Sequence, residues 1–200
     1  MTAEKSTIVG LTGSIGMGKT TTAKMFADIG IPVWDADKVV HRLYANDKDV
    51  FKKIIKLCPQ AAKNNIVDRQ ILKNWIAADG QNLKKLEDVV HPLIAKDRDA
   101  FLKENEGQLV VLDIPLLYEM NLENLVDYVI VVTASAEAQR QRVLDRKTMS
   151  QEQFDLILSK QMPDIEKRNR ADFVIETTSL ESASLRVEDI VKTLKDQICA

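Results

Sequence analysis

Residues 13–20 read Gly-Ser-Ile-Gly-Met-Gly-Lys-Thr. This stretch fits the pattern G-x-x-x-x-G-K-[ST], which is the phosphate-binding P-loop. Its glycines let backbone N–H groups converge on phosphate oxygens, and the helix that follows adds the positive end of its dipole. The pattern predicts that Lys19 reaches the β- and γ-phosphates of a nucleotide and that the Thr20 hydroxyl binds Mg²⁺.

The residues on either side supply the context that a P-loop requires. Residues 7–11 are apolar and rich in β-branched side chains, as is typical of a buried strand. A helix is expected from Lys19 to near Gly30, and it should bury Ala23, Phe26 and Ala27. The alternative is a glycine-rich turn with an incidental lysine. A chance match in 200 residues has odds on the order of one in a hundred at background composition, so nucleotide binding is favoured.

Helical patterns alternate with four more apolar runs, at residues 32–34, 108–113, 128–132 and 173–175. This alternation predicts an α/β fold, in which a five-stranded parallel sheet carries helices on both sides. Residues 39–105 have helical patterns and no strand-like run, so they are expected to form a helical insert. The last helix should carry an apolar stripe of Leu180, Ala183, Val187, Ile190, Val191, Leu194 and Ile198.

Composition narrows the class of protein. The 200 residues include 28 Lys and Arg against 30 Asp and Glu, and the net charge of −2 argues against a dedicated nucleic-acid binder. No stretch approaches the roughly 20 apolar residues of a membrane span, and the first residues lack the apolar region of a secretory signal. Cys58 and Cys199 are far apart and form no C-x-x-C pair, as expected of reduced thiols. We expect a cytoplasmic protein that binds neither nucleic acid nor membrane.

Carboxylates follow two of the expected strands. Asp113 ends the run 108–113 in a Walker-B arrangement, where it can hold Mg²⁺ directly or through water. Asp35 and Asp37 follow the second strand, so they should lie at the carboxyl edge of the sheet beside the phosphates. One of the two could accept a proton from a substrate hydroxyl. A helix N-cap is the alternative role for an aspartate at this position.

A cluster of cations follows the fourth strand. Residues 140–147 carry four cations and one anion, and Arg142 and Arg146 are four apart, on one helix face. Two guanidinium groups on one face suit phosphate clamping, whereas a solvated helix face is the alternative. The chain has no Asn-Lys-x-Asp guanine motif, which argues against a GTPase switch. An acceptor base, cations and a closing lid are what a small-molecule kinase needs.

Along nearly its whole length the chain resembles the dephospho-coenzyme A kinases. Residues 11–20 resemble that family's P-loop, with Ser14 where glycine is usual and Thr20 where serine is usual. The other resemblances are Asp35-Ala36-Asp37, Asp68-Arg69, Leu86-Glu87, His91-Pro92, the run from Asp113 to Glu119, Arg142, Arg146 and Gln161 of the lid, and residues 171–175. The run Asp113–Glu119 and the pair His91-Pro92 are the most specific of these, because P-loop kinases in general lack them.

The resemblance implies ATP-dependent, Mg²⁺-assisted phosphorylation of the ribose 3′-hydroxyl of dephospho-coenzyme A, the last step of coenzyme A synthesis. Asp37 would be the base, while Lys19 and Arg142 would neutralise charge on the moving phosphoryl group. ATP would be bound by Gly13, Ser14, Ile15, Gly16, Met17, Gly18, Lys19, Thr20, Thr21, Arg142 and Arg146. The acceptor would be bound by Asp37, His41, Arg42, His91 and Leu116, and Mg²⁺ by Thr20 and Asp113.

The resemblance also divides the chain. It implies a core of residues 1–38, 106–136 and 171–200, an acceptor-binding insert of residues 39–105, and a lid of residues 137–170. A monomer is favoured. The alternatives are another P-loop small-molecule kinase, such as a nucleoside monophosphate kinase, and a nucleotide-binding switch without acceptor chemistry.

Two positions depart from the family pattern. His41 stands where the family usually has arginine, so either His41 supplies a weaker, pH-dependent contact or Arg42 reaches the acceptor instead. Glu176-Thr177-Thr178 replaces a turn that usually contains asparagine, so contacts with adenine are expected to differ there.

Overall fold

The computed structural model describes residues 6–64 and 66–198, with Ile198 described by its backbone alone. Cys199 therefore lies outside the described residues, whereas Cys58 is a buried free thiol. The chain forms two compact units. The first comprises the residues up to Trp34 and those from Asn105 onward, and the second comprises Asp35–Glu104.

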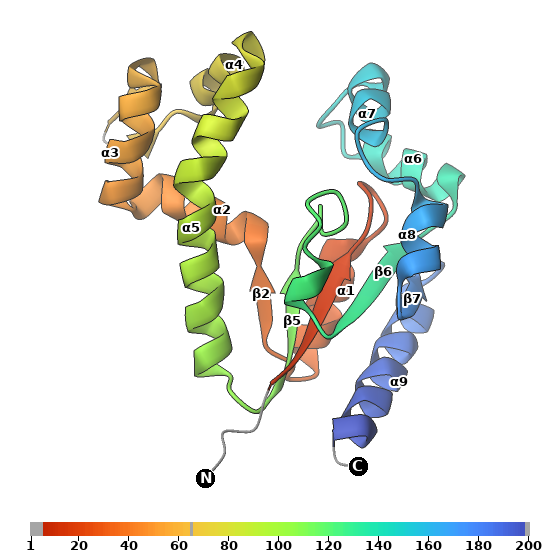
Figure 1. The fold of residues 1–200 in the computed structure, drawn as a ribbon. Coiled ribbons are helices and arrows are strands. Elements are labelled where there is room, and N and C mark those ends of the chain that lie inside the picture. Colours follow the sequence, from red (N-terminus) through yellow and green to blue (C-terminus); the bar gives the residue numbers. More distant parts are fainter. Residues whose placement is uncertain (1–5, 65, 199–200) are drawn as a thin grey trace. The chain divides into compact units, whose positions relative to one another are not determined.

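A five-stranded sheet is the centre of the first unit (Figure 1). Its strands are β1 (Thr7–Thr12), β2 (Val33–Asp35), β5 (Leu109–Asp113), β6 (Tyr128–Thr133) and β7 (Phe173–Glu176). They lie in the order β2-β5-β1-β6-β7. β1 pairs in parallel with both β5 and β6, and β6 pairs in parallel with β7. The predicted α/β fold with a parallel sheet is confirmed.

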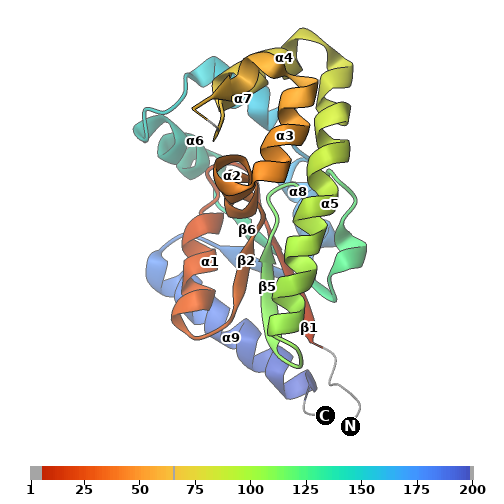
Figure 2. The ribbon, with the colours of Figure 1, turned by 90° about the vertical axis from the view of Figure 1, so that its left-hand side faces the viewer.

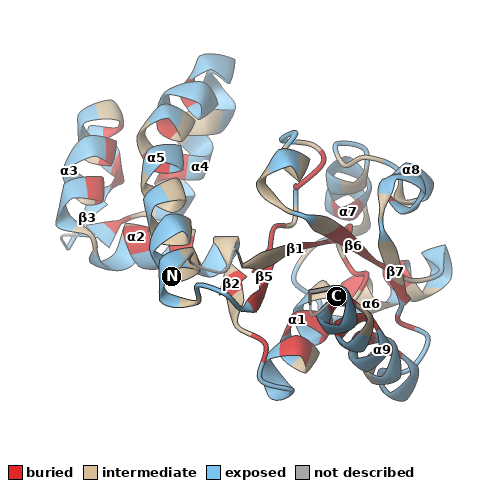
Figure 3. Cartoon of the chain, turned by 60° about the horizontal axis from the view of Figure 1, so that its bottom comes forward, coloured by how far each residue is buried: buried red, intermediate tan, exposed pale blue. Residues whose placement is uncertain are grey.

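Helices and loop segments cover both faces of this sheet, which is why its strands are continuously apolar. Helices α1 (Lys19–Asp28) and α9 (Leu180–Ile198) pack side by side on one face (Figures 2 and 3). Their apolar side chains form one core with alternate residues of β1, β5 and β6, among them Val9, Val111 and Ile130. The intervening residues, such as Leu112 and Val131, are buried on the other face. There the segment after β5 and helix α8 (Asp164–Arg170) cover the sheet.

Two details of the predicted helix faces are wrong. Ala27 is exposed, because α1 ends at Asp28 and the chain turns back through Gly30, so that Ile31 fills the core instead. Leu180 is 70% exposed, because it is the first residue of α9 and lies beyond the edge of the sheet core. Ala183, Val187, Ile190, Val191 and Leu194 are buried as expected.

The remaining helices of the first unit connect β6 to β7. They are α6 (Ala136–Asp145), α7 (Gln151–Leu158) and α8, and a short 3₁₀ helix, η2 (Glu123–Leu125), precedes β6. The Ser135 hydroxyl caps α6, and Ser150 and Gln153 form a capping box at the start of α7. These caps account for the break of the charged segment into separate short helices.

The second unit is helical with one small exception. It consists of α2 (Ala36–Asn46), α3 (Lys48–Leu57), η1 (Pro59–Ala61), α4 (Arg69–Ala78) and α5 (Gly80–Glu104). Strands β3 (Ala62–Lys63) and β4 (Ile66–Val67) pair antiparallel between η1 and α4. The prediction that this stretch holds no strand is therefore wrong, because strands of two residues are too short to show a period-2 pattern. None of the helices in the described ranges combines the length and apolar character of a membrane span.

Acid should weaken the cap of α4. The Asp68 carboxylate accepts the backbone N–H groups of Ile71 and Gln70, and these bonds lower its pKa. Because the pKa is lower in the folded state, the ionised carboxylate stabilises the fold. This stabilisation is fully present above the unfolded-state pKa of about 3.9 and is lost as the pH falls through the folded-state pKa. Asp68→Asn should therefore melt below the wild type near neutral pH, with the difference shrinking below about pH 4. Thermal melts across this range test the expectation, and a difference that does not change with pH would contradict it.

Candidate active site

The P-loop motif forms the turn between β1 and α1. Gly16 and Gly18 adopt left-handed conformations, with φ of 79° and 95°. A Cβ at Gly16 would come within 2.6 Å of Val143 Cγ2 and 2.9 Å of the Gln139 carbonyl oxygen. The loop therefore packs against α6, and only glycine fits where it does so. The motif has the strand–turn–helix context that its sequence predicted.

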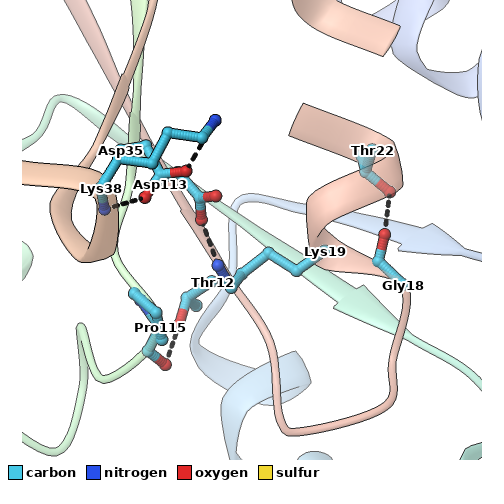
Figure 4. Close-up of polar contacts among 8 residues, drawn as sticks. All are labelled: Thr12, Gly18, Lys19, Thr22, Asp35, Lys38, Asp113 and Pro115. Carbon is cyan, nitrogen blue, oxygen red and sulfur yellow. Dashed lines mark hydrogen bonds and ion pairs between the residues drawn. The ribbon is translucent and has the colours of Figure 1, made fainter. Parts of the chain in front are cut away.

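Lys19 and Asp113 meet at the carboxyl ends of β1 and β5. The Lys19 ammonium group forms an ion pair and hydrogen bond with Asp113 Oδ1 (Figure 4). Both side chains are largely buried, at 14% and 4% exposure. The Thr12 hydroxyl donates to the Pro115 carbonyl oxygen at 3.0 Å and so ties the chain after Asp113 to the end of β1. The carboxylate of Asp113 thus holds the ammonium group of Lys19 beside the P-loop.

A cavity of about 330 Å³ opens beside the N-terminus of α1. Its walls include Gly18, Thr21, Arg142, Arg146 and Thr177. The Arg142 guanidinium donates from Nη1 to Thr177 Oγ1 at 2.8 Å and from Nη2 to the Thr177 carbonyl oxygen at 2.6 Å. Arg146 is the C-cap of α6 rather than a residue within the helix, yet it lines the same cavity. Arg142, Arg146 and the N-terminus of α1 all line this cavity, and such an arrangement suits an anionic ligand.

Two glutamines hold the tip of the P-loop at Ile15. Gln161, which precedes α8, accepts the Ile15 N–H through Oε1 at 3.1 Å. Gln139 of α6, only 4% exposed, donates from Nε2 to the Ile15 carbonyl oxygen at 2.7 Å. The predicted lid segment is therefore bonded to the P-loop through one residue of α6 and one residue that precedes α8. Gln161 was predicted only through the family resemblance, and Gln139 was not predicted, because in the sequence it looks like a solvated residue of a charged helix.

Glu119 joins the segment after β5 to α8. Its Oε1 lies 2.7 Å from Nζ of Lys167, whose side chain is fully buried, and accepts the Met162 N–H at 2.9 Å. The lysine nitrogen is poorly aligned for a hydrogen bond, so this contact is mainly ionic. The neighbouring Tyr118 is buried, which raises its pKa, and the Arg170 guanidinium 4.4 Å above its ring partly offsets that rise. Lys167 was missed because it lies among other charged residues in the sequence.

The residues predicted to bind an acceptor lie mostly in the second unit. Asp35 is the N-cap of α2 and accepts the Lys38 N–H at 2.9 Å, so the capping role expected as an alternative is the one it takes. Asp37 is exposed in the first turn of α2. Leu116, in the first unit, is 40% exposed. His91 lies on the exposed face of α5.

The departure at position 41 has a structural counterpart. Nη1 of Arg69 lies 3.0 Å from Nδ1 of His41, so a guanidinium group stands beside the imidazole that replaces the usual arginine. Arg42 forms an ion pair with Asp97 and is thereby engaged within the second unit. Arg69 belongs to the Asp68-Arg69 pair of the family resemblance but was not predicted as a binding residue. Its contact with His41 joins α4 to α2 and has no signal in the spacing of the two residues.

Three features define the class of protein as a P-loop kinase. They are a P-loop on a five-stranded parallel sheet, an ion pair between Lys19 and Asp113, and a cavity lined by Arg142 and Arg146. The family model described as Dephospho-CoA kinase matches residues 7–182. The chain belongs to the dephospho-CoA kinase family.

Individual relatives and solved structures resemble the chain over nearly its whole length. A relative from Cereibacter sphaeroides named dephospho-CoA kinase is 51% identical over 188 residues, which are 94% of this chain and 95% of that protein. The crystal structure of TT1252 from Thermus thermophilus has a TM-score of 0.87 at 33% identity and covers 95% of this chain and 98% of its own. A dephospho-CoA kinase from Campylobacter jejuni has a TM-score of 0.64 at 26% identity, over 94% of this chain and 97% of its own.

Proposed function

We propose that the chain transfers the γ-phosphoryl group of ATP to the ribose 3′-hydroxyl of dephospho-coenzyme A, giving coenzyme A and ADP. The observation that carries the proposal is that the family match covers both units, including the P-loop with the Lys19–Asp113 pair. The new bond joins the 3′-oxygen to the γ-phosphorus. The bond to the β–γ bridging oxygen breaks, and the hydroxyl proton passes to a base.

The nucleotide would occupy the P-loop and the adjoining cavity. Backbone N–H groups of residues 13–21 would receive the phosphates, and that of Ile15 would first have to leave Gln161 Oε1. Lys19 would exchange its contact with Asp113 for one with the β- and γ-phosphates. Arg142 and Arg146 would face the nucleotide from α6 and its C-cap. Lys19 and Arg142 would spread the charge of the transferred group, which is the main task of a phosphoryl-transfer enzyme.

Thr20 and Asp113 would hold Mg²⁺. A hydroxyl and a carboxylate are hard oxygen ligands, and Mg²⁺ in kinases is bound by one or two protein oxygens together with phosphates and water. Within the part of the chain that the structure describes, no group of three or more His, Cys, Asp or Glu side chains is placed to hold a metal ion. When bound, the metal neutralises charge on the β- and γ-phosphates.

The acceptor would be held by the helical insert. Asp35 is committed to capping α2, which leaves Asp37 as the carboxylate proposed to take the proton from the 3′-hydroxyl. His41, with Arg69 beside it, Arg42 and His91 would bind the acceptor, together with Leu116. Movement of the insert (residues 39–105) and of the lid (residues 137–170) would exclude water during transfer. A monomeric, cytoplasmic enzyme remains a prediction.

Release of ADP with different acceptors tests this function. ADP formation should be stimulated by dephospho-coenzyme A and not by nucleoside monophosphates, and it should be slow with no acceptor. Coenzyme A is the matched control, because its 3′-oxygen already carries a phosphate. Stimulation by a nucleoside monophosphate alone would make the protein a different small-molecule kinase. Failure of every acceptor would favour a nucleotide-binding switch.

A further inference from the structure

We propose that Thr177 is a positioning residue that fixes the direction of the Arg142 guanidinium in the nucleotide cavity. The proposal rests on the proposed function, because it assumes that Arg142 acts on the phosphates of ATP. Thr177 is the first residue after β7 and is 9% exposed.

One hydroxyl oxygen joins three parts of the site. Thr177 Oγ1 lies 2.9 Å from the carbonyl oxygen of Met17 in the P-loop and 3.1 Å from that of Thr133 at the end of β6. It also accepts Nη1 of Arg142 at 2.8 Å. A threonine hydroxyl has one proton and two lone pairs. The proton is therefore shared between the two carbonyl groups, and a lone pair receives the guanidinium.

Both terminal nitrogens of Arg142 form hydrogen bonds with Thr177. Nη1 donates to the side chain of Thr177 and Nη2 to its carbonyl oxygen. Two roughly parallel bonds fix the plane of a guanidinium group as well as its place. A charge fixed in advance does not have to reorient when the phosphoryl group moves.

Both acceptors on Thr177 are neutral, and this separates Arg142 from Lys19. Lys19 is paired with the carboxylate of Asp113, which opposes its charge. Thr177 orients Arg142 without opposing its charge, so the guanidinium can interact at full strength with an anion that enters the cavity. Arg142 is therefore poised for phosphate in a way that pairing with a carboxylate would not allow.

The methyl group of Thr177 has a separate role in packing. A Cβ added at Gly18 would lie 3.2 Å from Thr177 Cγ2, so the methyl group already sits against the P-loop. Thr177→Val keeps this shape and removes the hydroxyl, whereas Thr177→Ser keeps the hydroxyl and removes the methyl group. The two variants therefore separate the hydrogen bonds from the packing.

The experiment compares these variants by kcat, by KM for ATP and by ADP affinity measured calorimetrically. Thr177→Val should lower kcat/KM for ATP by about 10-fold to about 10²-fold, as expected when a charged group is misplaced by about 1 Å. Thr177→Ser should retain most of the wild-type value. The control is Thr193→Val in α9, which also removes a hydroxyl bonded to a backbone carbonyl and should leave kcat/KM unchanged. If Thr177→Ser is as impaired as Thr177→Val, packing explains the effect and the proposal fails.

A double-mutant cycle with Arg142→Ala decides through which group Thr177 acts. If Thr177 works through Arg142, Thr177→Val should cause little further loss in the Arg142→Ala background. The same fold-loss in both backgrounds would mean that Thr177 acts through Met17 or the fold, and would overturn the proposal. The cycle in ADP affinity needs no acceptor. It therefore reports on Thr177 even if dephospho-coenzyme A proves not to be phosphorylated, in which case the proposed function fails on its own.

Discussion

Asp37→Asn should lower kcat for the phosphorylation of dephospho-coenzyme A by about 10²-fold or more, since general-base catalysis contributes about 10²- to 10⁴-fold. The amide keeps the size of the carboxylate but cannot accept the hydroxyl proton. The N-cap of α2 is made by Asp35, so loss of the Asp37 charge should leave the helix folded. ADP affinity should change little, because the P-loop belongs to the other unit.

Asp49→Asn is the matched control. Asp49 is the second residue of α3 and follows an aspartate N-cap, as Asp37 does in α2. Its ion pair with Lys52, at 3.6 Å on the surface, is of a kind that contributes little. Both variants lose an acidic side chain near a helix N-terminus, but only Asp37→Asn should lose turnover. Equal, near-wild-type turnover in the two would assign Asp37 to stabilising the helix dipole and exclude it as the base.

Glu119→Gln should cost the fold about 3–5 kcal/mol, which is the usual loss when one partner of a buried ion pair is removed. Lys167 is fully buried, so its charge would stay in a low-dielectric site without the carboxylate that balances it. The Met162 N–H could still be accepted by the amide oxygen, so the loss comes chiefly from the charge. The free energy of unfolding by urea measures the effect.

The double variant Glu119→Gln with Lys167→Met distinguishes charge from packing. Removal of both charges should recover most of the lost stability, because an apolar pair in place of a buried ion pair is often neutral or stabilising. A double variant as unstable as Glu119→Gln alone would mean that packing around Glu119, and not its charge, holds α8 to the segment after β5.

The sheet and the P-loop were predictable because both are local signals. The central strands β1, β5 and β6 are mostly apolar on both faces, and the spacing from Gly13 to Thr20 is fixed by how a backbone wraps a phosphate. Lys19 and Asp113 were both expected at the phosphate site, although not as an ion pair with each other. These features need only the periodicity and order of the elements.

Other features were not predictable because they depend on contacts between distant segments. Lys167 and Gln139 look solvated in sequence, and only the packing of α8 and α6 buries them. Thr177 appeared as a departure from a family pattern, with no sign that its hydroxyl would meet both Met17 and Arg142. Hydrogen bonds of this kind arise where three elements end together, and residue spacing does not encode them.

Transfer of labelled phosphate from ATP shows which hydroxyl group of dephospho-coenzyme A the protein phosphorylates. The protein is incubated with Mg²⁺, dephospho-coenzyme A and ATP labelled in the γ-phosphate, and the labelled product is separated and treated with a 3′-nucleotidase. Label should appear in coenzyme A and be released by the 3′-nucleotidase, and no label should be transferred when coenzyme A replaces the acceptor. Label found only in inorganic phosphate, or on another hydroxyl of the acceptor, would contradict it.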